Sequence, residues 1–258
     1  MPRGRLAATC LALVLLTGCT PSEPAASSAP VVPSLPAPTA DASAELVAAI
    51  RKTAATSFTF AVDGNPKDGA VHHATGVFDP RGGKLRYNLR VTGGPDANPY
   101  HDETLIGSDD WMRSAAGDEW IHLNQRKLAR NSPWQIDLKD PSGLGAFAER
   151  AVGGTVNRIG PHAFEGEFDA YPAEHVMSLP VGPAYVHSGS TAPERIHFKA
   201  TTGSAGWITA VTMEWASYGL KVPHDVYTTK LAGHGKPVTV RKPSNTAEAD
   251  AASYRKTL

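Results

Sequence analysis

The chain has 258 residues, of which 25 are Lys or Arg and 25 are Asp or Glu, so its formal net charge is zero. This balance leaves no basic excess for a nucleic-acid partner, and no nucleic acid is expected. The stretch from residue 43 to residue 243, about 200 residues, is long enough for one well-cored domain.

The first residues have the pattern of a secretory signal peptide. Two arginines precede an apolar run from Leu6 to Leu16, which is too short to span a bilayer. The run leads into Leu16-Thr17-Gly18-Cys19, which resembles the lipobox of bacterial lipoproteins. This resemblance implies that residues 1–18 are removed and that Cys19 is acylated. An ordinary signal peptide with an accidental Cys is the alternative.

A lipid on Cys19 would anchor the protein to the outer face of the cell membrane, because two or more acyl chains bind a bilayer stably. Cys10 would leave with the signal peptide, so no disulfide is expected. Residues 20–42 are mainly Pro, Ala, Ser and Thr, and cannot build a core. We expect residues 19–42 to form an extended tether, because Pro-rich segments rise about 3 Å per residue.

The first predicted element is a helix that ends near Thr56. Asp41 or Ser43 is a candidate N-cap, and Leu46, Val47 and Ile50 share one face. A second helix is predicted over Pro141–Val152, with Asp140 as N-cap and an apolar stripe formed by Leu144, Phe147, Ala148 and Ala151.

Alternating apolar residues predict strands before and after the second helix. In residues 84–91, Leu85, Tyr87, Leu89 and Val91 face one side and charged or polar residues the other. In residues 207–215, Trp207, Val211, Met213 and Trp215 are predicted to share a side. Further strands are expected at Phe58–Val62, Val71–Phe78, Glu103–Ile106, Asp110–Arg113, Glu119–Leu123, Phe164–Ala170, Arg195–Lys199, Val226–Leu231 and Pro237–Lys242.

The order of these elements indicates an α+β fold, in which a large antiparallel sheet has helices packed on one face. The polar residues 244–258 are expected to be a frayed C-terminal tail.

Several short segments occur in the order found in a known family. They include Gly76-Val77-Phe78-Asp79-Pro80, Asp110-Trp111-Met112-Arg113 and Gly117-Asp118-Glu119-Trp120-Ile121-His122-Leu123. The chain from about 43 to 243 thereby resembles the actinobacterial LppX/LprG-like lipoproteins, which share a half-barrel fold with the carrier LolA. The stretch from Tyr171 to Ala192 departs from the family pattern.

The resemblance implies a strongly curved antiparallel sheet, a half-barrel, with helices on its concave face. In the family, the apolar space between sheet and helices accepts acyl chains, and members carry lipids or lipoproteins across the envelope. Fold alone does not decide function.

No enzyme motif stands out, so we expect no catalytic residues and no cofactor. The segment Thr202-Gly203-Ser204-Ala205-Gly206 lacks the first Gly of a nucleophile elbow and is better explained as a turn. Ser253 and Lys256 match S-x-x-K without a second motif. The ten His residues are scattered, so solvated strand histidines are expected and no metal site.

The candidate ligand-binding residues are the apolar side chains expected between the second helix and the sheet: Phe60, Tyr87, Leu89, Phe147, Met213 and Trp215. Ordinary core packing explains each of them equally well, because a filled interior and a cavity need the same residues.

Three functions stay open at this point. The first is a monomeric, membrane-anchored protein that binds or carries a lipid or acylated ligand in the cell envelope. The second is an envelope-stress sensor that contacts a membrane partner, and the third is a passive envelope lipoprotein without a ligand. An open apolar pocket would favour the first, and a solid core with an apolar patch on the outside would favour the second or the third.

Overall fold

A computed structural model describes residues 40–65, 69–94, 101–114, 118–129, 132, 134–169, 195–216 and 225–255, with only the backbone at 40, 215, 216 and 225. The chain divides into two compact units, Met1–Leu35 and Pro36–Leu258, and every described residue belongs to the second. The expected signal peptide, Cys19, most of the expected tether and the stretch 171–192 lie outside the described residues.

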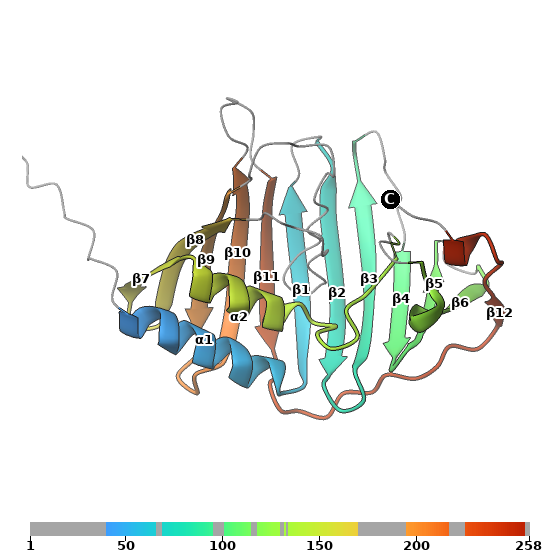
Figure 1. The fold of residues 1–258 in the computed structure, drawn as a ribbon, viewed down its shortest axis with the longest axis horizontal. Coiled ribbons are helices and arrows are strands. Elements are labelled where there is room, and N and C mark those ends of the chain that lie inside the picture. Colours follow the sequence, from blue (N-terminus) through green and yellow to red (C-terminus); the bar gives the residue numbers. More distant parts are fainter. Residues whose placement is uncertain are drawn as a thin grey trace, which may run out of the picture. The chain divides into compact units, whose positions relative to one another are not determined.

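The described part contains two α-helices, two short 3₁₀ helices and twelve strands (Figure 1). In chain order these are α1 Ala40–Ala54, β1 Phe58–Asn65, β2 Val71–Asp79, β3 Lys84–Thr92, β4 His101–Ile106, β5 Asp109–Arg113, β6 Trp120–Asn124, η1 Gln125–Lys127, α2 Leu144–Gly153, β7 Thr155–Gly160, β8 Ala163–Asp169, β9 Arg195–Thr202, β10 Ile208–Ala216, β11 Asp225–Ala232, β12 Thr246–Glu248 and η2 Ser253–Arg255.

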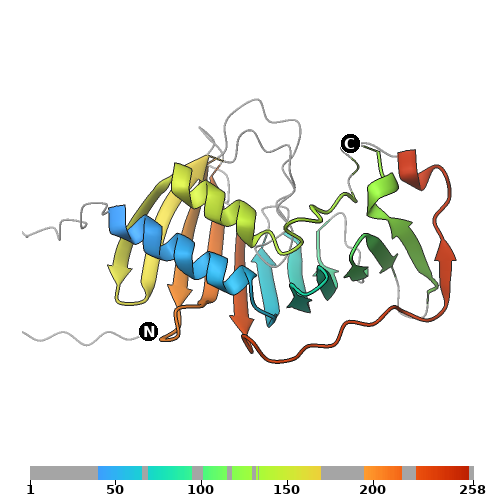
Figure 2. The same cartoon turned by 60° about the horizontal axis from the view of Figure 1, so that its bottom comes forward.

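All twelve strands belong to one sheet, in the spatial order β12-β6-β5-β4-β3-β2-β1-β11-β10-β9-β8-β7. Neighbouring strands are antiparallel except β12, which is parallel to β6. The pairing of β1 with β11 joins two meanders into one continuous, curved sheet. Both α-helices lie on its concave face (Figure 2), which confirms the predicted α+β half-barrel.

The helix α1 forms where the apolar spacing predicted one. Ala42, Leu46 and Ile50 are fully buried, one turn apart, and face α2 and the sheet. Thr53 is also fully buried, and its Oγ1 accepts a hydrogen bond from the N–H of Ile208 at 2.9 Å. This bond fastens the end of α1 to the start of β10.

The predicted caps of α1 are wrong, because the helix begins earlier than expected. It starts at Ala40, so Asp41 lies in its first turn and Ser43 inside it. The Ser43 hydroxyl instead donates to the carbonyl of Ala151 at 3.4 Å and links α1 to α2. Residues 40–42, which were expected to belong to the tether, are therefore helical.

The helix α2 buries its predicted stripe, but it begins three residues later than predicted. Its N-cap is Gly143, with φ near 70°, a conformation that favours glycine, and Pro141 lies in the turn before it. Asp140 is therefore not the N-cap residue. Its carboxylate still accepts a hydrogen bond from the N–H of Ala146 at 2.8 Å, so it caps the helix from outside.

The alternation predicted for β3 is confirmed. Leu85 and Val91 are buried, and Tyr87 and Leu89 are half-buried and pack against the core. Arg86, which lies between Leu85 and Tyr87, is exposed. The odd-numbered side chains of β3 therefore face the helices, and the even-numbered ones face away.

Trp207 does not belong to β10, which begins at Ile208 and contains a register shift between Ile208 and Ala210. Ile208 is fully buried, while Trp207 is half-buried. The Trp207 ring stacks on His234 at 5.3 Å between centroids, and Lys52 of α1 lies 5.0 Å from it. An extra residue in one strand breaks the two-residue period, so the alternation counted back from Val211 does not extend to Trp207.

The predictions for the C-terminal residues are also wrong. Residues 237–242 form no strand, and the residues expected to fray are ordered into β12 and η2. The N–H of Trp120 donates to the carbonyl of Asn245, and Tyr254 accepts from the N–H of Asn124 at 3.1 Å. These bonds and the β12–β6 pairing cover the free edge of β6.

Candidate functional site

The space between α2 and the sheet is filled by side chains. Phe147 is fully buried, and its ring lies 5.3 Å from that of Phe198 and 6.2 Å from that of Phe168. Met213, paired with Phe198 across the β9–β10 ladder, is also fully buried. The aromatic contacts of Phe147 are therefore with β8 and β9. The candidates Phe60 on β1 and Leu89 on β3 lie on strands further along the same sheet.

The other candidate ligand residues divide into two groups. Phe60 is a core residue whose ring lies over Gly76, where any Cβ would come within 2.4 Å of it. Tyr87 and Leu89 are half-buried at the border of the core. The side chain of Trp215 lies outside the described residues, although its backbone pairs within β10.

The concave surface of strands β3, β4, β5 and β6, here called the β3–β6 face, lies beyond the helices. Both helices contact β7, and they also contact β8 and β10 (Figure 1). Strand pairing places Tyr87, Glu103, Met112 and Ile121 in one row across the β3–β6 face. Ile121 is 37% exposed and Met112 is half-buried, so this row is a partly open apolar surface.

A buried carboxylate lies in the middle of this row. Glu103 is only 7% exposed, and its Oε2 accepts a hydrogen bond from the hydroxyl of Tyr87 at 2.5 Å. The Nε2 atom of His101 lies 3.1 Å from the same oxygen. The β3–β6 face therefore combines apolar side chains with one fixed polar centre.

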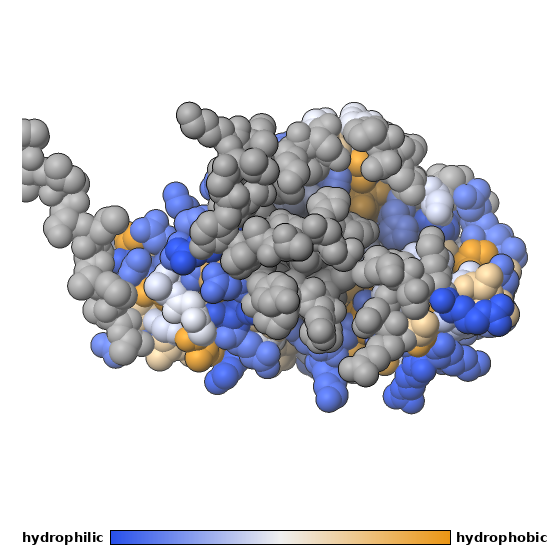
Figure 3. Space-filling model, turned by 45° about the horizontal axis from the view of Figure 1, so that its top comes forward, coloured by the Kyte–Doolittle hydropathy of each residue, from blue (hydrophilic) through white to orange (hydrophobic). Residues whose placement is uncertain are grey.

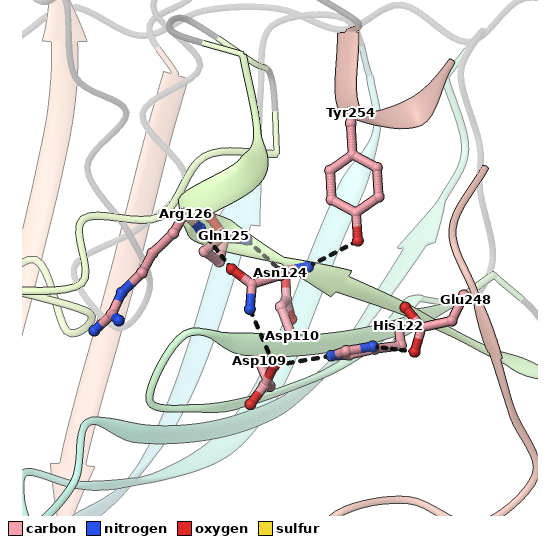
Figure 4. A network of polar contacts seen from close by, with 8 residues as sticks. All are labelled: Asp109, Asp110, His122, Asn124, Gln125, Arg126, Glu248 and Tyr254. Carbon is pink, nitrogen blue, oxygen red and sulfur yellow. Dashed lines mark hydrogen bonds and ion pairs between the residues drawn. The ribbon is translucent and has the colours of Figure 1, made fainter. Parts of the chain in front are cut away.

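A second acid, Asp110, is fully buried on the same face, one row away. Its Oδ2 accepts a hydrogen bond from Gln125 Nε2 at 2.8 Å (Figure 4). Burial raises the pKa of the Asp110 carboxyl well above its usual value, and the charge of Glu103 raises it further. The raised pKa favours the neutral acid at this position.

Gln125 also shapes the border of the β3–β6 face. Its Nε2 donates to the carbonyl of Trp134 at 2.9 Å, and its Oε1 accepts from the N–H of Ile136 at 2.9 Å. These bonds hold the segment after η1 against the sheet, where Ile136 and Leu138 pack on the core.

A separate polar network fixes the strands behind this face (Figure 4). His122 lies between Asp109 at 3.0 Å and Glu248 at 2.7 Å, and its ring stacks on Trp111 at 5.0 Å. The network joins β5, β6 and β12, and gives the β3–β6 face a rigid support.

Space-filling views show how apolar surface is distributed. Around the grey residues in Figure 3, hydrophobic surface occurs in small groups separated by hydrophilic residues. Two cavities are lined by described residues, and neither includes Phe147 or Met213. One, of about 280 Å³, lies beside the start of α2 and is lined by Ala54, Phe78, Pro80, Gly83, Leu138, Lys139, Asp140, Pro141, Ser142 and Gly145. The other, of about 500 Å³, lies against β1 to β5.

The sequence motifs weighed for chemistry take ordinary places. Residues 202–206 form the β9–β10 turn, closed by a bond from the N–H of Gly206 to the carbonyl of Gly203. The Ser253 hydroxyl donates to Asp250, and Lys256 lies outside the described residues. Within the described ranges, no group of three or more His, Cys, Asp or Glu side chains is placed to hold a metal ion. In that same part of the chain, no helix has the length and apolar character needed to cross a bilayer.

No family model matches this chain, and no curated protein matches it either. Among solved structures, a LolA superfamily protein from Nitrosomonas europaea is similar over 83% of this chain and 97% of its own, at 8% identity and a TM-score of 0.27. A chain from the de novo design of transmembrane β-barrels is similar over 69% of this chain and 96% of its own, at 7% identity and a TM-score of 0.22. Similarities this weak identify neither a family nor a function. The fold is therefore defined by the strand pairing described above.

Sequence reasoning did not identify Glu103, Asp110, Met112 and Ile121 as neighbours on one face. The available signal was the alternation within β4, β5 and β6, but these strands have only five or six residues each. Their register depends on pairing with β3, which no local pattern specifies.

Proposed function

We propose that this chain is a membrane-anchored, extracytoplasmic lipoprotein that binds an apolar, lipid-like ligand on the β3–β6 face. It would be a distant relative of the LppX/LprG-like lipoproteins and of LolA, and would act by binding alone, without catalysis or a cofactor. The Leu16-Thr17-Gly18-Cys19 segment supports the anchor, and the half-barrel with helices on its concave face is the architecture that the family resemblance implies.

The observation that carries the proposal is the partly open apolar row on the β3–β6 face. Tyr87, Met112 and Ile121 continue the core outward onto a concave surface away from β7, β8 and β10, where α1 and α2 make their main contacts with the sheet. An acyl chain laid along this row would be removed from water on one side by the sheet. Each CH₂ group covered in this way contributes up to about 0.8 kcal/mol.

Glu103 gives the proposed ligand a polar point of attachment. Its carboxylate is held by Tyr87 and lies near His101, so it accepts hydrogen bonds at a fixed position. A hydroxyl or amide group next to an acyl chain could donate to it. A purely hydrocarbon ligand would leave this acceptor covered and without a new donor, which is unfavourable.

The test compares two isoleucines at opposite ends of the sheet. Ile121 on β6 is 37% exposed on the proposed site, and Ile159 on β7 is 44% exposed away from it. We expect Ile121→Asn to weaken binding of a fluorescent fatty-acyl probe about fivefold, since covering one side chain contributes about 1 kcal/mol or more. Ile159→Asn should leave probe binding within twofold of that of the unaltered protein. All binding is measured in the Cys19→Ala variant, because this variant lacks the acyl chains that would otherwise be attached to Cys19.

Two results would contradict the proposal: no probe binding by the unaltered protein, or equal weakening by both substitutions. A third result would place the ligand elsewhere in the half-barrel. In that case probe binding is weakened by a change beneath α2, such as Phe147→Trp, and is not weakened by Ile121→Asn.

A passive envelope lipoprotein is the second candidate, because the filled space beneath α2 favours it. Phe147, Phe168 and Phe198 pack there as in an ordinary core. This candidate predicts that the unaltered protein binds no acyl probe, and the same titration therefore separates the two functions.

A further inference from the structure

Strands β3 to β6 carry all of their Lys and Arg residues on one side of the sheet. The residues of these strands that point to the concave side are Leu85, Tyr87, Leu89, Val91, His101, Glu103, Leu105, Asp110, Met112, Ile121 and Leu123. Two acids and one histidine are among these described residues, and no Lys or Arg is. The basic residues of the same strands lie on the opposite, convex side: Lys84, Arg86, Arg90 and Arg113.

Glu103 is the acid that a ligand on the β3–β6 face would meet. It shares a row with Met112 and Ile121, which lie one and two strands away, or about 5 Å and about 10 Å. The Tyr87 hydroxyl and His101 Nε2 both approach its Oε2. Within the described part of the chain, no group donates a hydrogen bond to the other oxygen, Oε1. This carboxylate, only 7% exposed, therefore still has an acceptor to offer.

The surroundings of Glu103 provide no excess of positive charge. Asp110 is a second acid, close enough for the charge of Glu103 to affect its protonation. Even a protonated His101 would be balanced by Glu103, to which its Nε2 is directed at 3.1 Å. Arg126, on the segment that borders the face, is exposed, and its side chain extends away from Asp110 in Figure 4. An anion on this face would therefore meet a negative charge without a cation to offset it.

We propose that the β3–β6 face selects lipids whose polar head carries a hydrogen-bond donor and no negative charge. A hydroxyl or ammonium group next to the chain donates to Glu103 Oε1 while the chain covers Met112 and Ile121. A carboxylate or phosphate at the same place is repelled and leaves the acceptor unsatisfied. The inference rests on the proposed function and adds the charge class of the head group, which excludes free fatty acids and phosphatidic acids.

The test compares three competitors that share one chain length: monolauroylglycerol, laurylamine and laurate. Each displaces an uncharged fluorescent acyl ester from the full chain with Cys19→Ala, below its critical micelle concentration. We expect the glycerol ester or the amine to bind roughly tenfold more tightly than laurate, because laurate alone is repelled by Glu103. The tighter of the two identifies the donor as a neutral hydroxyl or as an ammonium group.

Glu103→Gln should reduce this preference to less than about threefold, since Gln keeps an acceptor for the Tyr87 hydroxyl and removes the charge. The matched control is Asp63→Asn. Asp63 is also a carboxylate beside a histidine, with Oδ1 2.7 Å from His73 Nδ1, but it is exposed on the convex side of β1. This control should keep the preference within about twofold of that of the unaltered protein.

The outcomes separate this inference from the proposed function. If the uncharged ester does not bind at all, the proposed function fails and the inference fails with it. If all three competitors bind equally, or if Glu103→Gln keeps the full preference, the face binds lipid but does not select its charge, and only the inference is overturned. The comparison in the unaltered protein decides the matter even if Glu103→Gln does not fold.

Discussion

Asp110 is fully buried beside Glu103, and its environment makes it one source of pH dependence in the stability of this protein. Burial, and secondly the charge of Glu103, raise the pKa of the Asp110 carboxyl. Folding therefore favours the protonated acid. The stabilisation is complete below the unfolded pKa of about 3.9 and is lost as the pH rises through the higher folded pKa.

Replacing Asp110 with Asn should remove this pH dependence. Asn keeps an acceptor for Gln125 Nε2 and carries no charge at any pH. We expect Asp110→Asn to be at least as stable as the unaltered protein at pH 7, with a flatter dependence between pH 4 and 7, measured by urea unfolding. Asp110→Ala, which leaves Gln125 without this acceptor, should instead cost about 1–3 kcal/mol. A large loss of stability at pH 7 in the Asn variant would show that the charged form is needed.

Phe147 tests whether the space beneath α2 is filled. Because this side chain is fully buried between Phe168 and Phe198, a larger ring has no room. Phe147→Trp should lower the free energy of unfolding by about 1–3 kcal/mol, as overpacked cores do. Unchanged stability combined with weaker probe binding would instead reveal a ligand space at this position.

At the scale of elements, local sequence patterns predicted most of the helices and strands. The spacing of Leu46 and Ile50 and the alternation of Leu85 to Val91 specify one face of α1 and one face of β3, because each element has a single buried side. The bulge before Ala210 was not predictable, since it inserts one residue without a Gly or Pro to mark it.

The C-terminal strand was missed because its partner is distant in sequence. Residues 246–248 are polar, and they become a strand only by pairing with β6, more than 120 positions earlier. The candidate site was missed for a similar reason. Glu103 and Asp110 read as exposed charges in short strands, and only the sheet register and Gln125 show that they are buried.

Deleting β12 tests its structural contribution. A chain ending at Pro243 loses the pairing with β6 and the hydrogen bond between Asn124 and Tyr254. We expect a lower Tm and concentration-dependent self-association by light scattering, because an uncovered strand edge pairs with other chains. Tyr254→Phe, which loses one hydrogen bond, should cost only about 1 kcal/mol. A deletion variant that melts with the full chain and stays monomeric would show that β12 contributes nothing.

At the scale of the whole molecule, the proposed lipid anchor and the folded unit would have separate roles. The proposed anchor rests on Cys19 behind the apolar run. Cys19→Ala should move the protein from the membrane fraction to uncleaved precursor or soluble protein. The intact mass of the membrane-extracted protein should exceed that of the chain from Cys19 by at least a diacylglyceryl group. An unmodified Cys19 in that spectrum would be incompatible with a lipoprotein.

Native mass spectrometry of the Cys19→Ala protein, purified as soluble protein from the cells that produce it, tests the central claim, that the β3–β6 face holds an apolar ligand, most directly. The Cys19→Ala chain should carry a bound species of lipid mass that is released on collisional activation. Ile121→Asn should lose most of this species, while Ile159→Asn keeps it. A spectrum in which the Cys19→Ala chain carries no lipid would contradict the account. Equal lipid occupancy in the Ile121→Asn and Ile159→Asn variants would contradict it too.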